Sequence, residues 1–390
     1  MNKNELKVGI DKLSFFVPNF YVDMTDLALA RHVEPAKFHV GIGQDEMAVN
    51  PITEDIVTFA TNAAAAIVSD ADKKLIDMVI VGTESSVDES KASAVVVHGL
   101  LDIQPFARSI EFKEACYAAT AGLALARDHV WRHPERKVLV IAADIAKYGL
   151  RTGGEPTQGA GAVAMIISAN PRILALNSDN VSLTQDIYDF WRPMGQTYPS
   201  VDGKFSNSVY IDAFAQVWEE YSARFGAKFS DFAALAFHTP YTKMGKKALL
   251  PKLEQESADT RNHLLEQYEK GIVYNRRVGN LYTGSLYLSL ISLLENSEDL
   301  AAGDKLGLFS YGSGTVAEFF SGELMPDFRH HLRAEAHQNL LDRRVKLSIE
   351  AYETMFNEQI DLNHNTIFAD DLPFSISEVR DNHRIYRKTI

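Results

Sequence analysis

The chain has 390 residues, one cysteine and a formal net charge of −13, and 46% of its residues are hydrophobic. It exceeds an average domain of roughly 100–200 residues and can bury a large core. The acidic balance argues against a general nucleic-acid binder, which needs a basic face. No apolar run approaches the roughly 20 residues that cross a bilayer, and a single cysteine is usual in a reducing compartment. We therefore expect a cytoplasmic protein that binds neither nucleic acid nor membrane.

Strand-like and helical patterns alternate along the first half of the chain. Residues 7–16 are typical of a strand, and residues 53–69 carry an alanine-rich helical pattern. Residues 75–82 (LIDMVIVG) form a continuous apolar run, as in a strand buried on both faces. The pattern then predicts a helix with small residues at its start and two more buried strands (116–131, 137–143 and 161–168).

The second half repeats this order. The pattern predicts a long amphipathic helix, a buried strand, a helix with small residues at its start and another buried strand (210–225, 232–237, 282–295 and 305–310). In each half a buried strand ends at a polar residue, Glu84 or His238, and a helix start follows near Cys116 or Asn280. We interpret this as an internal duplication into halves 1–170 and 171–390, although any α/β protein shows some alternation.

The charged C-terminal segment is treated as part of the second half. It begins at residue 323, is mostly helical in pattern to about residue 358, and is then irregular. No low-complexity linker separates the halves, so we expect them to pack tightly.

Cys116 and Glu84 are the first candidates for chemistry. Cys116 precedes a helix rich in small residues, and a helix N-terminus favours a thiolate. A free cysteine is more often a buried structural residue, so Cys116 alone does not decide the matter. Glu84 ends a buried strand, where a carboxylate is costly unless it is hydrogen-bonded or functional. It could take a proton from an acyl group on the cysteine, or simply cap a turn.

His238 ends a second buried strand, where α/β folds place ligand sites. It could orient a carbonyl or exchange a proton, or it could be a hydrogen-bonded structural histidine. Lys243, Lys246 and Lys247 follow it. In an acidic protein this cluster suits a phosphate-bearing ligand such as coenzyme A (CoA), although a solvated helix face is equally compatible.

Asn280 and Ser313 lie in small-residue segments. The amide of Asn280 could hold a substrate oxygen or cap a helix. The backbone N–H of Ser313 could face an oxyanion, or the segment could be an ordinary turn. Neither Gly159–Gly161 nor Gly312–Gly314 continues into a dinucleotide-binding fingerprint. His330, His331 and His337 have charged neighbours and are interpreted as a solvated helix face rather than a metal site.

Six segments together resemble the bacterial form of the hydroxymethylglutaryl-CoA synthase family. They are Gly41–Gln44 with Glu54 and Asp55, Gly82–Ser85, Glu114–Tyr117, Phe237–Pro240, Gly279–Ser285 and Ser310–Gly314. The resemblance covers nearly the whole chain. It implies an α/β, thiolase-like fold of five αβαβα layers built from two duplicated halves, usually as a homodimer.

The resemblance also implies a mechanism. Cys116 would take the acetyl group of acetyl-CoA, and Glu84 would deprotonate the acetyl methyl group. The carbanion equivalent would add to acetoacetyl-CoA, and hydrolysis would release 3-hydroxy-3-methylglutaryl-CoA, a mevalonate precursor. No metal or cofactor is implied.

Further residues receive roles from the same resemblance. His238 would position the acetoacetyl thioester and Asn280 would help to hold it. The N–H groups of Cys116 and Ser313 would form the oxyanion hole. Tyr148, Lys243 and Lys247 match positions that line the site or contact CoA.

Three rival functions on the same fold are disfavoured by particular residues of the sequence. A thiolase uses a second cysteine as its base, and this chain has none. A β-ketoacyl-acyl-carrier-protein synthase III would use Cys116, His238 and Asn280 but would not need Glu84, because decarboxylation generates its carbanion. A non-catalytic acyl-CoA-binding protein or scaffold on the same fold would be expected to have lost these residues.

Overall fold

The computed structural model describes residues 6–388, and its main feature is a ten-stranded sheet. The N-terminal half contributes β1 (Val8–Phe16), β4 (Ile76–Gly82), β5 (Arg108–Phe112), β6 (Lys137–Ala146) and β7 (Gly159–Ala169). The C-terminal half contributes β8 (Leu174–Leu176), β9 (Val181–Thr184), β12 (Ala234–Phe237), β13 (Lys305–Gly312) and β14 (Val316–Leu324). The strand order is β12-β13-β14-β8-β1-β7-β6-β4-β5, with β9 paired to β14.

The two halves of the sheet share one strand order. The run β4-β6-β7-β1 in the first half corresponds to β12-β13-β14-β8 in the second. The first pair of each run is parallel. The third strand of each run is antiparallel to both of its neighbours. Because β8 bonds to both β1 and β14, it joins the two half-sheets.

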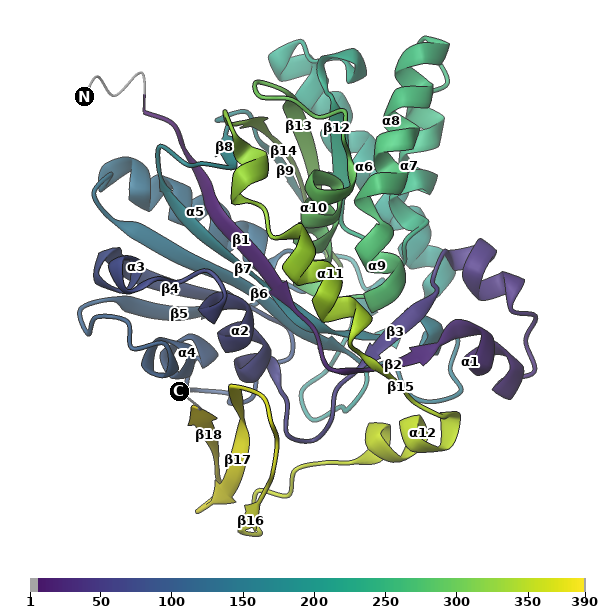
Figure 1. Cartoon of the computed structure of the whole chain (residues 1–390). Coiled ribbons are helices and arrows are strands. Elements are labelled where there is room, and N and C mark those ends of the chain that lie inside the picture. The colour runs from purple at the N-terminus through teal and green to yellow at the C-terminus, as the bar shows by residue number, and fades with distance from the viewer. Residues whose placement is uncertain (1–5, 389–390) are drawn as a thin grey trace.

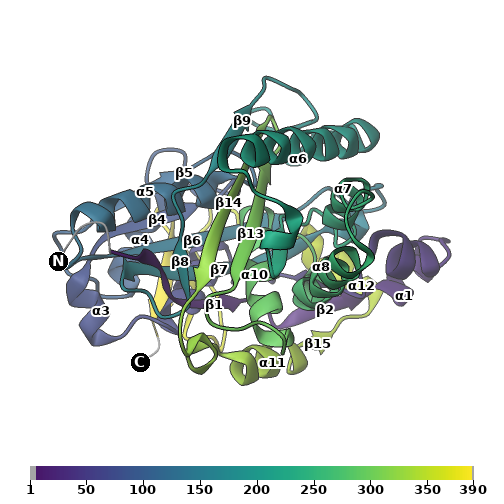
Figure 2. The same ribbon diagram turned by 90° about the horizontal axis from the view of Figure 1, so that it is seen from above.

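Helices cover both faces of each half-sheet. They are α2 (Ile56–Ala65), α4 (Ser93–Leu100), α5 (Ala118–Arg132), α6 (Gly203–Phe225) and α10 (Ser285–Asn296). Helices α2 and α4 pack on one face of the N-terminal half-sheet and α5 on the other, while α10 and α6 pack on the C-terminal half-sheet. Thr120 of α5 and Tyr287 of α10 are hydrogen-bonded at 2.8 Å, so these two helices meet in the centre. The predicted five-layer fold is confirmed (Figure 1, Figure 2).

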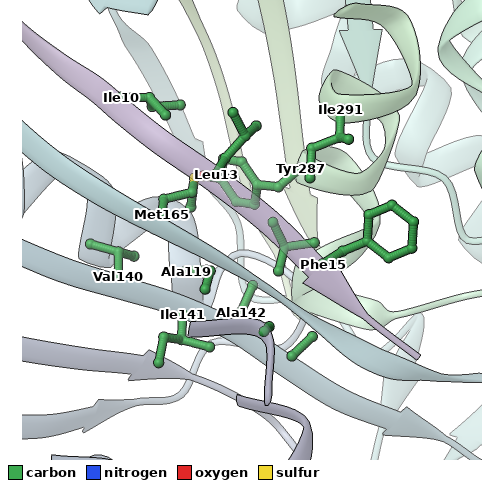
Figure 3. Packing of buried hydrophobic residues seen from close by; sticks show 14 of the residues in the cluster. Ile10, Leu13, Phe15, Ala119, Val140, Ile141, Ala142, Met165, Tyr287 and Ile291 are labelled. Atoms are coloured by element: carbon green, nitrogen blue, oxygen red, sulfur yellow. The ribbon is translucent and has the colours of Figure 1, made fainter. Parts of the chain in front are cut away.

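A continuous apolar core explains why these segments are strands. Every residue of β7 up to Ser168 is buried, and β6 is nearly as enclosed, because helices cover both faces. Figure 3 shows Leu13 and Phe15 of β1 packed near Tyr287 and Ile291 of α10. Burying each such large side chain contributes about 1.5–3 kcal/mol. The core therefore fixes α5 and α10 against the sheet, and with them the residues at their N-termini.

The smaller elements complete the chain. The helices are α1 (Met24–Ala30), a π-helix (Lys37–Ile42), α3 (Asp70–Leu75), α7 (Met244–Lys252), α8 (Ala258–Gly271), α9 (Val273–Val278), α11 (Ala334–Asp342) and α12 (Ile349–Asn357). The short 3-10 turns are η3 (Glu155–Thr157), η4 (Phe229–Asp231), η5 (Tyr282–Gly284) and η6 (Phe328–His331). The strands are β2 (Phe20–Asp23), β3 (Glu46–Val49), β10 (Phe190–Trp191), β11 (Ser200–Val201), β15 (Val345–Lys346), β16 (Thr366–Ile367), β17 (Phe374–Arg380) and β18 (His383–Lys388). Among residues 6–388, no helix is both long and apolar enough to cross a membrane.

The C-terminal segment differs from its prediction in two ways. The chain after residue 358 is not irregular throughout, because β16, β17 and β18 form a small sheet. This sheet, drawn in yellow in Figure 1, packs on the N-terminal half. There the side-chain amide of Asn62 in α2 donates a hydrogen bond to the carbonyl of Phe374 at 2.9 Å. His337 is not on a solvated face either: it is buried and bonds to Glu295 at 2.8 Å and Ser14 at 3.0 Å.

Candidate active site

A cavity of about 960 Å³ lies where the ends of the duplicated elements meet. Most of the predicted site residues line it: Cys116, Tyr148, His238, Lys247, Asn280 and Ser313. Glu84 joins the site through a direct contact with the cysteine. Lys243 is not among the lining residues; it directly precedes α7. The sequence-predicted residues, Lys243 excepted, therefore come together at one place.

Cys116 sits on a tight turn just before α5. Ala115 adopts a left-handed φ of 41°, and α5 begins at Ala118. The thiol donates to Oε1 of Glu84 at 3.3 Å. This approach depends on Gly82, since a Cβ there would lie 2.5 Å from the backbone nitrogen of Ala119. The end of β4 can thus pack directly on the start of α5, which places the carboxyl beside the sulfur.

Burial controls the proton affinity of this pair. Burial, and then the charge of Asp144, raises the pKa of Glu84. Burial and the nearby carboxylates also raise the pKa of the Cys116 thiol well above its usual value. Both groups therefore hold their protons more tightly than in water, and the start of α5 is the local feature that opposes this for the thiol.

Asp144, near the end of β6, holds the segment around Glu84 in place through hydrogen bonds. It is fully buried and accepts hydrogen bonds from the Thr83 hydroxyl at 3.0 Å, the Glu84 N–H at 2.9 Å and the Ser85 hydroxyl at 2.8 Å. It also accepts from the N–H of Thr283 at 3.2 Å, across the boundary between the halves. Burial raises the pKa of Asp144 too. Its donors favour the ionised form, so Glu84 is the carboxyl that binds a proton more readily.

His238 presents a neutral ring to the cavity. It is 1% exposed, and burial lowers its pKa to about 3. Among residues 6–388, no group forms a hydrogen bond with its Nδ1 atom. A neutral imidazole can donate from one nitrogen and accept at the other. A substrate carbonyl or hydroxyl could therefore supply the partner that this buried nitrogen lacks.

Asn280 lies in the turn before α10, where its neighbours hold its amide group. Its Oδ1 accepts from the N–H of Tyr282 at 2.8 Å and from the hydroxyl of Ser285 at 2.8 Å, which shapes the turn before α10. The oxygen is thereby occupied, so the NH₂ group faces the cavity and donates to the hydroxyl of Tyr148 at 3.3 Å. The amide is held in one orientation with a donor available beside the site.

Ser313 is brought to the cysteine by its neighbour Gly312. A Cβ on Gly312 would lie 2.6 Å from the carbonyl oxygen of Glu114 and 2.7 Å from the nitrogen of Tyr117. Glycine at this position allows the β13–β14 turn to approach the cysteine turn. The turn is braced by buried Asp189, which accepts from the Gly314 N–H at 3.0 Å.

Aromatic and basic side chains form the rest of the cavity. Tyr148, Phe190 and Tyr282 make mutual edge-on contacts beside Cys116. Lys204 and Lys247 also line the cavity, and Lys247 donates to the hydroxyl of Tyr241 at 3.0 Å. Lys246 instead pairs with Glu269 at 2.6 Å. The part of the site beside Cys116 is therefore apolar, and the cavity wall also carries cations that suit phosphate groups.

Several residues of this site were not predicted from the sequence. Asp144 directly follows the strand predicted at 137–143, so the rule that singled out Glu84 and His238 could have found it. Asp189 and Phe190 lie in a segment with no periodic pattern and gave no signal. Among residues 6–388, no group of three or more His, Cys, Asp or Glu side chains could hold a metal ion.

Comparison with known proteins decides the family. The model for the hydroxymethylglutaryl-coenzyme A synthase N-terminal domain matches residues 4–172, and that for the C-terminal domain matches residues 177–262 and 252–383. The chain belongs to the hydroxymethylglutaryl-CoA synthase family. Family membership confirms the resemblance seen in the sequence and makes this an enzyme of the acyltransferase type.

Individual relatives are similar over almost their whole length. A hydroxymethylglutaryl-CoA synthase of Enterococcus faecalis is 64% identical over 382 residues, which are 98% of this chain and 100% of the relative. A crystal structure of a hydroxymethylglutaryl-CoA synthase complexed with CoA superposes with a TM-score of 0.96 at 47% identity, covering 98% of this chain and 100% of that one. MvaS in complex with 3-hydroxy-3-methylglutaryl-CoA gives a TM-score of 0.90 at 35% identity, covering 98% and 99%.

Proposed function

We propose that this chain condenses acetyl-CoA with acetoacetyl-CoA and water to give 3-hydroxy-3-methylglutaryl-CoA and CoA, a step toward mevalonate and isoprenoids. The observation that carries the proposal is the 3.3 Å contact between the Cys116 thiol and the Glu84 carboxyl inside a cavity that His238 and Asn280 also line. Solved members of the family bound to CoA and to 3-hydroxy-3-methylglutaryl-CoA support it.

The first step is acyl transfer to Cys116. The thiolate sulfur attacks the carbonyl carbon of acetyl-CoA, a new carbon–sulfur bond forms, and the bond to CoA sulfur breaks. The proton lost by Cys116 is balanced by the one that the CoA thiolate takes up. The turn before α5 supports the thiolate. The N–H groups of Cys116 and Ser313 are proposed to stabilise the oxyanion.

The second step is the condensation, and it needs a base. Glu84 removes a proton from the acetyl methyl group, which lies close to the sulfur it already contacts. The resulting carbanion equivalent attacks the ketone carbon of acetoacetyl-CoA, and the alkoxide takes the proton back from Glu84. A carboxyl whose pKa is raised by burial suits both directions, because its two forms are then closer in energy near neutral pH.

The third step is hydrolysis of the thioester on Cys116. Water adds to the thioester carbonyl, the carbon–sulfur bond breaks, and the thiol and a free carboxylate result. The acyl group leaves as 3-hydroxy-3-methylglutaryl-CoA, still bound to the CoA of the second substrate. The same oxyanion site serves this step as the first.

The remaining residues are proposed to bind and orient substrates. The neutral ring of His238 and the amide NH₂ of Asn280 would hold the acetoacetyl carbonyl groups. Tyr148 closes the apolar end of the cavity. Lys247 and the more distant Lys243 are proposed to meet the phosphates of CoA.

We also propose the surroundings in which the enzyme works. No step above needs a metal or cofactor, since both carbon skeletons arrive as CoA thioesters. A homodimer in the cytoplasm is the proposed working form. The halves 1–170 and 171–390 are proposed as its two duplicated units, and this boundary falls between β7 and β8.

The reaction is tested with purified protein, acetyl-CoA and acetoacetyl-CoA. We expect loss of the acetoacetyl enolate absorbance to match release of one CoA thiol and to require both substrates. The rival activity is tested in parallel with malonyl-acyl-carrier protein as the second substrate. Efficient turnover with that substrate, and none with acetoacetyl-CoA, would overturn the proposal.

A further inference from the structure

The β10–β11 hairpin places the guanidinium group of Arg192 beside Glu84, the proposed base. This hairpin begins next to buried Asp189, which accepts from the hydroxyl of Tyr311 at 2.9 Å and is therefore fixed to the C-terminal half. Phe190 of the hairpin contacts the rings beside Cys116. Arg192 follows two residues later, and its Nη2 donates a hydrogen bond to the backbone carbonyl of Glu84 in the N-terminal half.

The groups that surround the Glu84 carboxyl and influence its pKa are mostly anionic or neutral. They come from the cysteine turn, the end of β6 and the segment after it, and the turn before α10: Glu114, Cys116, Asp144, Tyr148 and Tyr282. Arg192 supplies the positive charge on the remaining side and lowers the pKa of Glu84 against the other influences. Lys147 is close in sequence, but its ammonium group lies 4.9 Å from the ring of Phe356.

We propose that Arg192 is a positioning residue for the base: it holds the Glu84 loop under the hairpin and supplies the positive charge that keeps the carboxylate available. This rests on the proposed role of Glu84. It follows that the position of the β10–β11 hairpin and the ionisation state of Glu84 are coupled through the side chain of Arg192. Because Arg192 is exposed, its electrostatic effect is screened by salt.

Three variants test this inference. Arg192→Met removes the charge but keeps much of the length, and Arg192→Lys keeps the charge. Arg224→Met is the matched control, because Arg224 is an exposed arginine of α6 bonded to Glu220. Each is assayed for the pH dependence of condensation at low and high salt, for acetylation by labelled acetyl-CoA, and for thermal unfolding.

In Arg192→Met we expect the acidic limb of the pH profile to move to higher pH by about 0.5–1 unit, since loss of a nearby cation raises a carboxyl pKa. Added salt should shrink the shift. Arg192→Lys should restore most of the wild-type limb, Arg224→Met should leave it unchanged, and acetylation should change less than about threefold.

The inference would be overturned if a folded Arg192→Met variant kept the acidic limb of the wild-type pH profile. It would also be overturned if Arg192→Lys shifted that limb as far as Arg192→Met does. The wild-type enzyme separates this failure from failure of the proposed function. If wild type itself neither acetylates nor condenses, the function is wrong; if it does both and only the Arg192 shift is missing, Arg192 alone is misassigned.

Discussion

Replacing Glu84 by Gln is expected to separate acyl transfer from condensation. The amide keeps the size of the side chain beside the sulfur but cannot accept a proton from the acetyl methyl group. General-base catalysis typically contributes about 10²–10⁴ in rate, or about 3–5 kcal/mol of barrier, and we expect condensation to fall by that range. The Glu84 charge raises the pKa of the thiol, so removing it eases thiolate formation. Acetylation should therefore stay within about tenfold of wild type.

The assay follows both steps in the same preparation. Labelled acetyl-CoA reports the acetyl-enzyme, and a chase with acetoacetyl-CoA reports its consumption. Glu89→Gln is the matched control, because Glu89 is exposed on the loop that follows Glu84. The reasoning is refuted if Glu84→Gln condenses at the wild-type rate. It is also refuted if the folded variant forms no acetyl-enzyme.

Other predictions concern binding, stability and packing. His238→Ala should raise the KM for acetoacetyl-CoA at least about tenfold and leave acetylation largely intact, since the buried Nδ1 has no partner in the described part of the chain; an unchanged KM contradicts this. Burial raises the pKa of Glu54 well above its usual value, so the folded state binds a proton that the unfolded state releases, and stability falls as pH rises above about 4. Glu54→Gln should thus gain about 1–3 kcal/mol over wild type in urea unfolding at pH 8, with a smaller gain at pH 5; equal gains at both pH values would argue against it. Gly82→Val should lower the melting temperature sharply, because its Cβ would meet backbone 2.5 Å away; a wild-type melting curve would be contrary.

The buried strands were predictable because both of their faces are covered. Runs such as 75–82 and 137–143 are apolar except for Asp77 and Lys137, and they correspond to β4 and the first part of β6 in the structure. The start of α6 was placed too late, at 210, since the helix begins at Gly203. The first turns of this helix are exposed and show no periodic pattern of apolar residues. The side chain of Asp202 fixes the start of the helix instead, by accepting a hydrogen bond from the N–H of Phe205. Hydrophobic periodicity detects burial and gives no signal where a helix faces water.

The same physics explains what was found at the site. Glu84 and His238 stood out because polar residues end strands that are otherwise apolar. Asp189 could not be found this way, because its partners Tyr311 and Gly314 are more than a hundred residues distant and only the fold brings them together. The burial of His337 was not predicted, because residues near it in the sequence are polar or charged and exposed, while His337 itself is buried.

The location of the acyl group decides whether Cys116 is the nucleophile. Protein mixed with labelled acetyl-CoA, without acetoacetyl-CoA, is digested and its peptides are analysed by mass spectrometry. We expect one acetyl group per chain, bound as a thioester to Cys116 and lost on addition of acetoacetyl-CoA. Label at any other residue, or an active enzyme that carries no acetyl group on Cys116, would contradict it.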